Sequence, residues 1–440
     1  MSHNPWAANV KFENGQLIVA GLSAKELAAE YGTPAYILDE EDFKARASAF
    51  TNAMAKSFDS SIVYYASKAF LCKQVVRLIH ELGMGIDVAT GGELEVALAM
   101  EFPAHRIEVH GNNKSLSELD FALENNVGIF VVDSFFEIAR LAQISSEKNK
   151  KADVLVRVTA GVEAHTHEFV ATAHEDQKFG FSLAAGDADE AVRRVIKDEN
   201  LNFKGLHSHI GSQIFENKAF EIAAQRLTEL SVRIFKELNV QVEMLNLGGG
   251  MGIAYINSDS PLEIESMAKE LVEIVYKNFI NSSLKMPQLA FEPGRAIVGP
   301  AMITLYQVGT IKSVQLESGE KRTYVAVDGG MSDNIRTALY GADYTCALVS
   351  RLSDKTLMLS RIVGKHCESG DIVVKDCYLP NDLAPGDLIA VAATGAYNRS
   401  MSSQYNLVLR PGVIGINDGK VREILKRETF KDLFITDPGM

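Results

Sequence analysis

Short apolar runs alternate with amphipathic segments through the middle of the chain, from about residue 60 to residue 295. The amphipathic segments, such as residues 220–238 and 264–279, carry apolar side chains at helical spacing. Strands that alternate with helices predict parallel βαβ units. The predicted strands are residues 62–66, 85–89, 107–110, 128–133, 154–158, 203–210, 243–247 and 288–292.

Eight such units in about 240 residues match the size of a (β/α)8 TIM-type barrel. A doubly wound open sheet is the alternative, because periodicity does not reveal whether a sheet closes. Polar residues recur where the predicted strands end, and barrel active sites lie at that face. They are Lys68, Asp87, His110, Asp133, Arg157, His209, Gly248 to Gly250 and Glu292.

Beyond about residue 300 the helical periodicity stops, and strand-like segments separated by Gly, Pro and Asp follow. These segments are residues 302–313, 322–328, 360–364, 371–377, 387–393 and 405–414. At the N-terminus, residues 11–20 read as a hairpin that turns at Asn14-Gly15, followed by a helix over 23–31 and a strand over 35–39. We therefore predict an α/β plus β chain. Residues 41–300 form the barrel, and residues 1–40 and 301–440 form a mostly β-sheet or β-barrel domain.

Composition narrows the possible partners. The 440 residues are 47% hydrophobic and 23% charged, as in a globular protein, and the net charge is −13. Such a charge argues against nucleic acid or an anionic membrane as a partner. Four cysteines without a CxxC pair, and no secretory signal at the N-terminus, lead us to expect a cytoplasmic protein.

Lys68 follows the apolar run 62–66 and precedes a helix-like segment. In one interpretation it is an ordinary surface lysine in a strand–helix turn. In the other it is desolvated, loses its charge and becomes a nucleophile that forms a Schiff base.

Two histidine-containing stretches have several possible roles. His207 and His209 lie two residues apart on a predicted strand and share a face. They are hydrogen-bonded core residues, a metal pair, or imidazoles stacked on a planar ring, and the metal pair ranks last. The stretch His165-Thr166-His167-Glu168 lacks the HExxH spacing and is predicted to be a loop.

The ends of the last two predicted strands carry further candidates. Gly248-Gly249-Gly250 is either a phosphate-binding loop or a flexible turn. Glu292 either pairs with Arg295 or faces a protonated ring nitrogen while Arg295 binds an anionic group. In the β domain, Cys367 beside His366 is an inert thiol or an acid or base.

Several of these stretches together resemble one family, the pyridoxal-phosphate-dependent decarboxylases of the alanine-racemase-like barrel fold. The resemblance extends over nearly the whole chain and, within the family, points to the branch that converts meso-2,6-diaminopimelate to L-lysine and CO2, the last step of lysine synthesis. An ornithine-, arginine- or carboxynorspermidine-type decarboxylase, a racemase and a non-catalytic cofactor-binding relative are the alternatives. The stretches are residues 65–69, 209–212, 248–250, 292–295, 367–371 and 395–397.

The resemblance implies that Lys68 holds pyridoxal 5'-phosphate as a Schiff base and that His209 stacks on its ring. Glu292 would keep the ring nitrogen protonated, so that the ring acts as an electron sink, and Asp87 would position Lys68 and His209. The remaining cofactor-binding residues would be Ser212, Gly248, Gly249, Gly250, Pro293, Gly294, Arg295 and Tyr397.

The resemblance also implies a substrate site for a second carboxylate and a second amine, which two arginines and a glutamate would recognise. Cys367 would donate the proton that replaces CO2. Cys367 and Glu368 would reach the site from the partner subunit of a homodimer, and no metal is expected. The substrate-binding residues would be Arg295, Arg336, Tyr340, Glu368 and Tyr397.

One position departs from the family pattern. Relatives commonly carry an uncharged pair with Cys or Tyr after the Gly-Ala-Tyr stretch, whereas Asn398-Arg399 follow Tyr397 here. The charge of Arg399 therefore bears on the local fit of the substrate.

Overall fold

The computed structural model describes residues 4–58, 60–162, 178–282 and 284–439. They form two compact units. The barrel unit comprises Ala47–Gly252 and Pro261–Gly294, and the β unit comprises Met1–Arg46, Ile253–Ser260 and Arg295–Met440.

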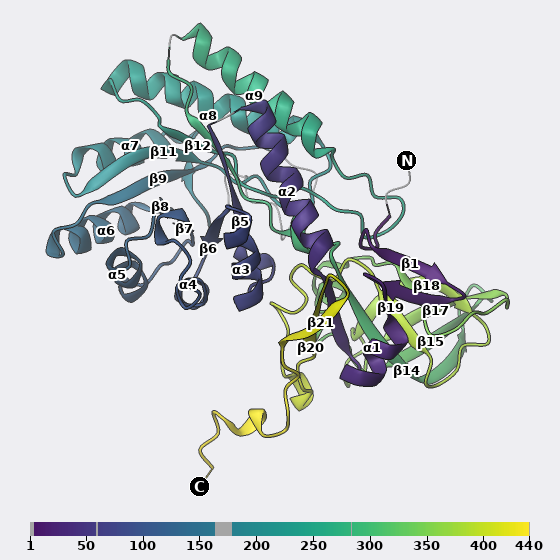
Figure 1. The fold of residues 1–440 in the computed structure, drawn as a ribbon. Helices are drawn as coiled ribbons and strands as arrows, with labels where there is room; N and C mark the ends of the chain where they lie inside the picture. The colour runs from purple at the N-terminus through teal and green to yellow at the C-terminus, as the bar shows by residue number, and fades with distance from the viewer. Residues whose placement is uncertain (1–3, 59, 163–177, 283, 440) are drawn as a thin grey trace. The chain divides into compact units, whose positions relative to one another are not determined.

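The barrel unit contains all eight predicted parallel strands (Figure 1). The strands follow the order β9-β11-β12-β13-β5-β6-β7-β8, and β8 pairs in parallel with β9, so the barrel closes. The TIM-type prediction is confirmed, and the open-sheet alternative is wrong. The bounds are β5 (Ser61–Ala66), β6 (Gly85–Val88), β7 (Ile107–Val109), β8 (Ile129–Val132), β9 (Ala152–Thr159), β11 (Leu201–His207), β12 (Met244–Asn246) and β13 (Gln288–Phe291).

The helices of this unit begin where the sequence supplies capping residues. Ser115 and Glu118 form a capping box at the start of α5, while Thr90 and Ser134 cap α4 and α6 through their hydroxyl groups. Each capping residue fixes the position at which the strand-to-helix loop passes into the helix. The caps therefore help to position the side chains of these loops. The bounds are α3 (Lys73–Glu81), α4 (Gly91–Leu98), α5 (Leu116–Glu124), α6 (Phe135–Glu147), α7 (Asp187–Lys197), α8 (Asn217–Leu238) and α9 (Ile264–Asn281). Of α2 (Glu40–Ser57), the residues from Ala47 onward belong to this unit.

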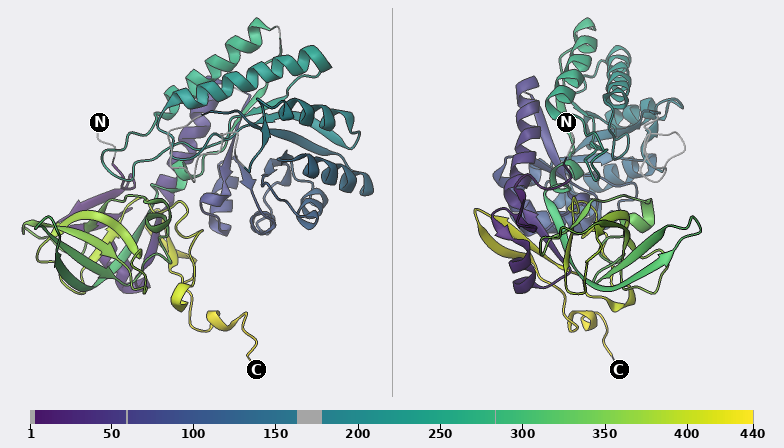
Figure 2. Two further views of the ribbon diagram at one scale, coloured as in Figure 1. Left: turned by 180° about the vertical axis from the view of Figure 1, so that it is seen from behind. Right: turned by 90° about the vertical axis from the view of Figure 1, so that its right-hand side faces the viewer.

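The β unit is built on a curved sheet with the order β18-β17-β15-β14-β4-β20-β21, seen from two further sides in Figure 2. The predicted strand β4, from the N-terminal part of the chain, lies between β14 and β20. The bounds are β4 (Ala35–Asp39), β14 (Met302–Gln315), β15 (Lys321–Val327), β16 (Cys346–Leu348), β17 (Leu357–Val363), β18 (Ile372–Pro380), β19 (Leu388–Val391), β20 (Gly412–Asn417) and β21 (Lys420–Leu425).

The predicted strand over residues 405–414 is wrong for its first half. Tyr405–Leu407 is a short 3-10 helix, and the strand begins only at Gly412. Asn406 and Leu407 have positive φ angles of 52° and 55°, which are incompatible with regular extended backbone. Pro411 lacks the N–H that a ladder needs, so it delays the start of the strand.

The predicted N-terminal hairpin is present and packs with the β unit, as expected. Its strands are β1 (Val10–Glu13) and β2 (Gln16–Val19), and Asn14-Gly15 forms the turn with positive φ angles of 49° and 74°. The Leu17 N–H donates to the Val349 carbonyl oxygen at 3.2 Å. After the hairpin, α1 (Ala24–Tyr31) forms over the predicted helix.

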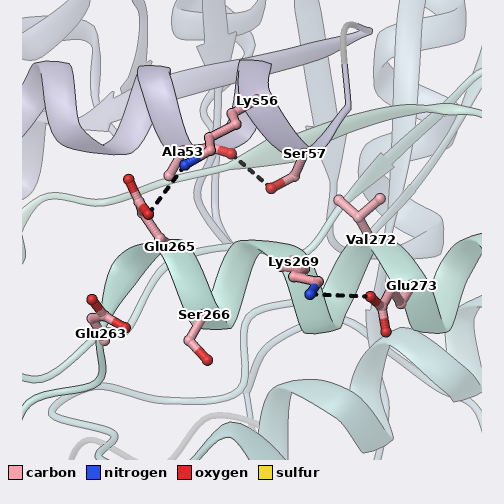
Figure 3. Close-up of a pocket in the computed structure, with 9 residues that line it drawn as sticks. All are labelled: Ala53, Lys56, Ser57, Glu263, Glu265, Ser266, Lys269, Val272 and Glu273. Carbon is pink, nitrogen blue, oxygen red and sulfur yellow. Dashed lines mark hydrogen bonds and ion pairs between the residues drawn. The ribbon is translucent and has the colours of Figure 1, made fainter.

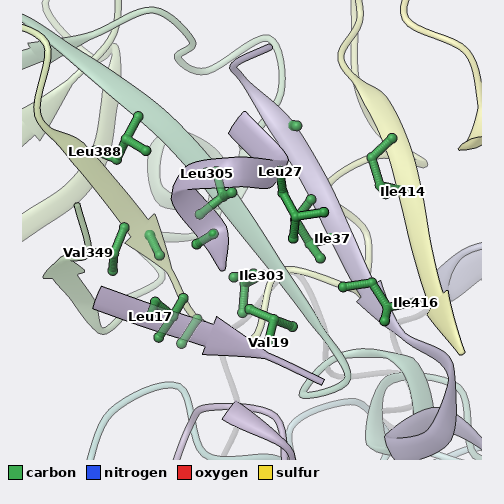
Figure 4. Packing of buried hydrophobic residues seen from close by; sticks show 14 of the residues in the cluster. Leu17, Val19, Leu27, Ile37, Ile303, Leu305, Val349, Leu388, Ile414 and Ile416 are labelled. Carbon is green, nitrogen blue, oxygen red and sulfur yellow. The ribbon is translucent and has the colours of Figure 1, made fainter. Parts of the chain in front are cut away.

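One apolar core joins the elements of the β unit (Figure 4). It contains Leu17 and Val19 of the hairpin, Ile37 of β4 and Ile303 of β14, which are all at most 1% exposed. Segments more than 250 residues apart in the sequence therefore share one core. In the described parts of the chain, no helix combines the length and apolar character needed to cross a membrane.

Truncation of Ile303 in this core should destabilise the β unit. The fully buried side chain would leave a cavity, so Ile303→Ala should lower the free energy of unfolding by about 2–5 kcal/mol. The chain's single tryptophan, Trp6, belongs to the same core, and its fluorescence during urea unfolding provides the measurement. Leu357→Ala, at a side chain 62% exposed, is the control and should change the value by less than about 0.5 kcal/mol. Equal effects of the two variants would contradict the packing.

Candidate active site

Lys68 lies directly after β5, in the short 3-10 helix Ser67–Ala69. Lys68 is exposed, whereas Ser67 and Ala69 on either side of it are buried. The charge of Lys68 acts on two neighbours in the barrel unit. It opposes the rise in the pKa of Asp87, which burial raises to about 6, and it helps burial to lower the pKa of His209.

His209 follows β11 and is neutral at physiological pH, because burial, Lys68 and Arg157 hold its pKa well below the usual value. The Gly249 N–H donates to His209 Nδ1 at 3.3 Å. This bond makes Nδ1 the acceptor and leaves the ring proton on Nε2. The imidazole is therefore an uncharged, oriented plane at the end of the barrel strands.

The glycine run after β12 allows three strand ends to approach one another. A Cβ at Gly249 would lie 2.1 Å from the Glu292 carbonyl oxygen, and a Cβ at Gly250 would lie 2.2 Å from that of Gly211. Gly250 also has a φ of +106°, which other residues rarely adopt. Only glycine meets these conditions, so the run is a tightly packed loop and not a flexible turn.

Glu292 follows β13 and is buried at the same end of the barrel. Three groups converge on its Oε1: Asn246 Nδ2 at 2.8 Å, His207 Nε2 at 3.0 Å and His110 Nε2 at 3.2 Å. Burial opposes the charge of Glu292, but the two histidines outweigh it and hold its pKa well below the usual value. Glu292 is thus a buried, ionised carboxylate.

The two histidines next to Glu292 carry different charges. Burial opposes the charge on His110, yet Glu292 and Glu108 raise its pKa to about 10. Burial dominates at His207 and lowers its pKa to about 4. Their ring centroids lie 5.0 Å apart in an edge-to-face arrangement. The ligand atoms of Glu292 and both histidines lie within 4.8 Å of one another, as in metal sites, but the pairing of an imidazolium with a carboxylate accounts for this closeness.

In the β unit, Arg295 and Arg336 are both buried next to tyrosines. Arg295 Nη1 donates to Tyr255 Oη at 2.5 Å, and its guanidinium lies 4.7 Å from the centre of the Tyr397 ring. Arg336 Nη1 donates to Tyr344 Oη at 2.6 Å and lies 4.6 Å from the Tyr255 ring. Cation–π contacts and hydroxyl groups stabilise a guanidinium without cancelling its charge.

Asn398, the position that departs from the family pattern, belongs to this arginine cluster. It is fully buried, and its Oδ1 accepts a hydrogen bond from Tyr344 Oη at 3.2 Å. Arg399 Nη1 donates to Ser402 Oγ at 3.1 Å. The departure therefore places a neutral amide against the tyrosine that holds Arg336.

The loop with Cys367 and Glu368 is exposed. Glu368 Oε1 accepts from Tyr405 Oη at 2.5 Å, and this bond raises the pKa of Tyr405. His366 is buried, with its ring held by Ser332 Oγ at 2.8 Å and by Asn406 Oδ1 at 3.0 Å. These hydrogen bonds fix the ring of His366 within the loop. The hydroxyl group of Tyr405 is the hydrogen-bond partner of Glu368.

The predicted residues divide between the two units. Pro293 accepts a backbone hydrogen bond from Ala66 at 3.3 Å, which brings its segment to the end of β5. Residues 165–168, predicted to be a loop, lie outside the described residues. The barrel unit carries Lys68, Asp87, His209, Ser212, Gly248, Gly249, Gly250, Glu292, Pro293 and Gly294, and the β unit carries Arg295, Arg336, Tyr340, Cys367, Glu368 and Tyr397.

Several polar residues of these sites were not identified as such from the sequence. Asn246 is the last residue of β12 and lies two residues before Gly248, and this position at a strand end was the available signal. Tyr255 and Tyr344 lie in segments without a recognisable pattern. These residues orient charged groups rather than carry charge themselves.

A pocket of about 510 Å³ on the outside of the barrel unit lies between α2 and α9 (Figure 3). None of the predicted site residues lines it. Its lysines already have partners, since Lys56 lies 3.4 Å from Glu265 and Lys269 lies 3.9 Å from Glu273. This pocket is therefore distinct from the candidate site at the strand ends.

Comparisons with known proteins agree on one family. Residues 41–299 match the model of the pyridoxal-binding domain of pyridoxal-dependent decarboxylases. A diaminopimelate decarboxylase of Mycobacterium tuberculosis is 52% identical over 439 residues, which cover 98% of this chain and 97% of that protein. One from Bacillus subtilis is 42% identical, covering 97% of this chain and 96% of its own. The crystal structure of diaminopimelate decarboxylase from M. jannaschii with L-lysine has a TM-score of 0.91 at 30% identity, covering 99% of this chain and 98% of that one.

The charge of His110 should make the stability of the barrel unit depend on pH. Its pKa is about 10 in the folded chain and about 6.5 when unfolded. The stabilisation is therefore complete below pH 6.5 and lost as the pH rises through 10. His110→Gln should cost about 3–5 kcal/mol near pH 6.5, because it leaves Glu292 without its cation, and the difference from the wild type should shrink towards pH 10.

Urea unfolding followed by far-UV circular dichroism at pH 6.5, 8 and 10 measures this difference. His105→Gln, at an exposed histidine of the same unit, is the control and should cost little at any of these pH values. A cost of His110→Gln that stays constant across the range would show that His110 is not a cation.

Proposed function

The chain belongs to the pyridoxal-dependent decarboxylases, and we propose that it converts meso-2,6-diaminopimelate to L-lysine and CO2, the last step of lysine synthesis. The observation that carries this proposal is the 52% identity to a diaminopimelate decarboxylase over almost the whole of both chains. The site residues implied by the family resemblance are all present in this chain.

The residues of the barrel unit suit pyridoxal 5'-phosphate. We propose that Lys68 holds the cofactor covalently and that His209, a neutral plane, stacks on its ring. The ionised carboxylate of Glu292 holds a proton on the ring nitrogen, and Asp87 positions Lys68 and His209. When bound, the cofactor supplies a sink for the electron pair that remains when CO2 leaves.

The phosphate group of the cofactor requires hydrogen-bond donors on a segment without large side chains. We propose that the backbone of Gly248, Gly249 and Gly250 surrounds it, because residues without side chains let the main chain approach a phosphate closely. The Ser212 hydroxyl group and the Tyr397 phenol donate further hydrogen bonds. The backbone of Pro293 and Gly294, together with Arg295, completes the cofactor-binding set.

The substrate has two carboxylates and two amines, so its recognition needs both signs of charge. We propose that Arg295 and Arg336 bind carboxylate groups, supported by their burial next to tyrosines. Glu368 binds the distal amine, and Tyr340 and Tyr397 orient the chain of the substrate. Ornithine lacks a second carboxylate and would leave a buried guanidinium without an anion, which disfavours the ornithine-type alternative.

We propose that Cys367 Sγ donates the proton that takes the place of CO2, and that Cys367 and Glu368 act in the site of a partner subunit. The exposure of this loop supports that assignment, because a residue that serves another chain must be accessible on its own. A homodimer follows from the proposal. The proposed domain division is the cofactor-binding barrel over residues 41–300 and the β domain over residues 1–40 and 301–440.

We further propose that the protein acts in the cytoplasm. The four cysteines, Cys72, Cys346, Cys367 and Cys377, are free thiols in the structure. A reducing compartment preserves such thiols, and Cys367 needs its proton for the proposed step.

Loss of Lys68 should abolish the reaction. Lys68→Ala removes the covalent attachment, so CO2 release from diaminopimelate should fall more than about a thousandfold. Borohydride should fix the cofactor to the wild type and not to the variant, as measured by mass spectrometry of the residue 68 peptide. Lys73→Ala, at an exposed lysine five residues on, is the control and should retain both properties. Retained turnover in Lys68→Ala would refute the mechanism.

Loss of Arg336 should affect the choice of substrate. Arg336→Gln removes a charge-assisted hydrogen bond worth about 1.5–3 kcal/mol, so kcat/KM for diaminopimelate should fall about 10- to 150-fold. Wild-type enzyme should release lysine from diaminopimelate and little CO2 from ornithine. Arg361→Gln, at an arginine of β17 that pairs with Asp376, should leave both rates unchanged. A wild-type preference for ornithine would favour the alternative decarboxylase.

A further inference from the structure

Glu108 is a buried carboxylate for which the proposed reaction has no use. It lies on β7 and is fully buried inside the barrel unit. A carboxylate in such a place costs free energy unless its neighbours compensate for the lost water. The groups that surround it therefore indicate its role.

The amide of Asn246 joins Glu108 to Glu292. Asn246 Oδ1 accepts from the Gly248 N–H at 2.8 Å, which fixes the orientation of the amide. Its Nδ2 then has two hydrogens, and these are donated to Glu108 Oε2 at 2.9 Å and to Glu292 Oε1 at 2.8 Å. One side chain thus ties the position of Glu292 to that of Glu108.

The His110 imidazolium is a second link between the same two carboxylates. Its Nε2 lies 3.5 Å from Glu108 Oε2 and 3.2 Å from Glu292 Oε1. These are the two oxygens that also accept from Asn246, so the cation and the amide bridge the pair side by side. Without Glu108, the cation would be attracted to one carboxylate of the pair and the amide would lose one acceptor.

Glu108 changes charge near neutral pH. Burial raises its pKa to about 7, against the hydrogen bond with His110, which lowers it. The local charge next to Glu292 therefore changes by one unit as the pH passes through this value. The charged and titratable groups that face this network are Tyr64 on β5, Lys68 after β5, Asp87 on β6, Glu93 on α4, His110 after β7, Arg157 on β9, His207 on β11 and Glu292 after β13.

We propose that Glu108 is a positioning residue for Glu292. Its carboxylate anchors the Asn246 amide and the His110 imidazolium, and these two groups hold Glu292 in the orientation and charge that the ring nitrogen of the cofactor requires. The inference rests on the proposed function, since it gives Glu292 the role described above. In this inference, the carboxylate of Glu108 acts on the cofactor only through the carboxylate of Glu292.

The charge of Glu108 should change the affinity of the ring nitrogen for its proton in one direction. Ionised Glu108 adds negative charge, which favours the proton on the ring nitrogen, so the ring should hold that proton more firmly above pH 7 than below it. The absorbance of bound pyridoxal phosphate and its dissociation constant should both change with pH, with a midpoint near 7. Asp87 contributes a separate change near pH 6, where burial places its pKa.

The experiment compares wild-type holoenzyme with Glu108→Gln, which keeps the shape of the side chain and removes its charge. In the variant the midpoint near pH 7 should disappear from the absorbance and from the dissociation constant, both measured from pH 5 to 9. The kcat value should fall about tenfold, the size seen when a supporting partner of an active-site group is removed, with KM within about twofold. Glu137→Gln is the matched control, because Glu137 is also buried in the barrel unit but pairs with Lys114 at 2.7 Å. It should keep the midpoint.

A Glu108→Gln holoenzyme with the wild-type pH profile and kcat would overturn the inference, even if its melting temperature fell, since Glu108 would then be merely structural. If the variant does not fold, the wild-type titration decides, because the absence of a change between pH 6.5 and 8 would also overturn it. A wild-type protein that neither binds pyridoxal phosphate nor releases lysine would overturn the proposed function first. A working wild type with an unaffected variant would overturn this inference alone.

Discussion

The buried negative charge of Glu292 is the constraint on which the candidate site depends. A lone carboxylate in the barrel would take up a proton, and it remains ionised because His110 carries a positive charge beside it. The groups that hold it come from separate strands, since Asn246 ends β12, His207 ends β11 and His110 follows β7. A closed barrel is the arrangement that brings these strand ends together, so the charge and the fold support each other.

The two units stabilise buried charge in different ways. In the barrel unit, the His110 imidazolium, the neutral ring of His207 and the amide of Asn246 surround the carboxylate of Glu292 at hydrogen-bond distance. In the β unit, the Arg336 guanidinium rests against the ring of Tyr255 in a cation–π contact and donates a hydrogen bond to the Tyr344 hydroxyl group. Neither contact cancels its charge. The first arrangement balances a buried negative charge within the barrel unit, whereas the second leaves the positive charge of Arg336 unbalanced by its tyrosine neighbours.

Much of the fold could be predicted from the sequence because it rests on local patterns. Apolar runs marked the eight barrel strands, and Asn14-Gly15 marked the hairpin turn. The prediction of a strand over residues 405–414 was wrong for its first half, because the apolar pattern does not reveal the positive φ angles of Asn406 and Leu407. Lys68 and Glu292 could be identified because they follow predicted strands. The roles of Glu108 and Tyr344 depend on their hydrogen-bond partners Asn246 and Arg336, which lie 138 and 8 residues away and are known only from the folded chain.

The tyrosine-lined surroundings of Arg336 have a thermodynamic consequence. Among the residues that the structure describes, no carboxylate pairs with the buried Arg336 guanidinium, and such an unbalanced buried charge costs the β unit free energy. A ligand carboxylate that binds there would compensate this cost only in the folded chain, so the free energy of unfolding would rise with the logarithm of ligand concentration. The fold would thus be most stable when its substrate or product is abundant, and the supply of that metabolite would influence how long the protein survives.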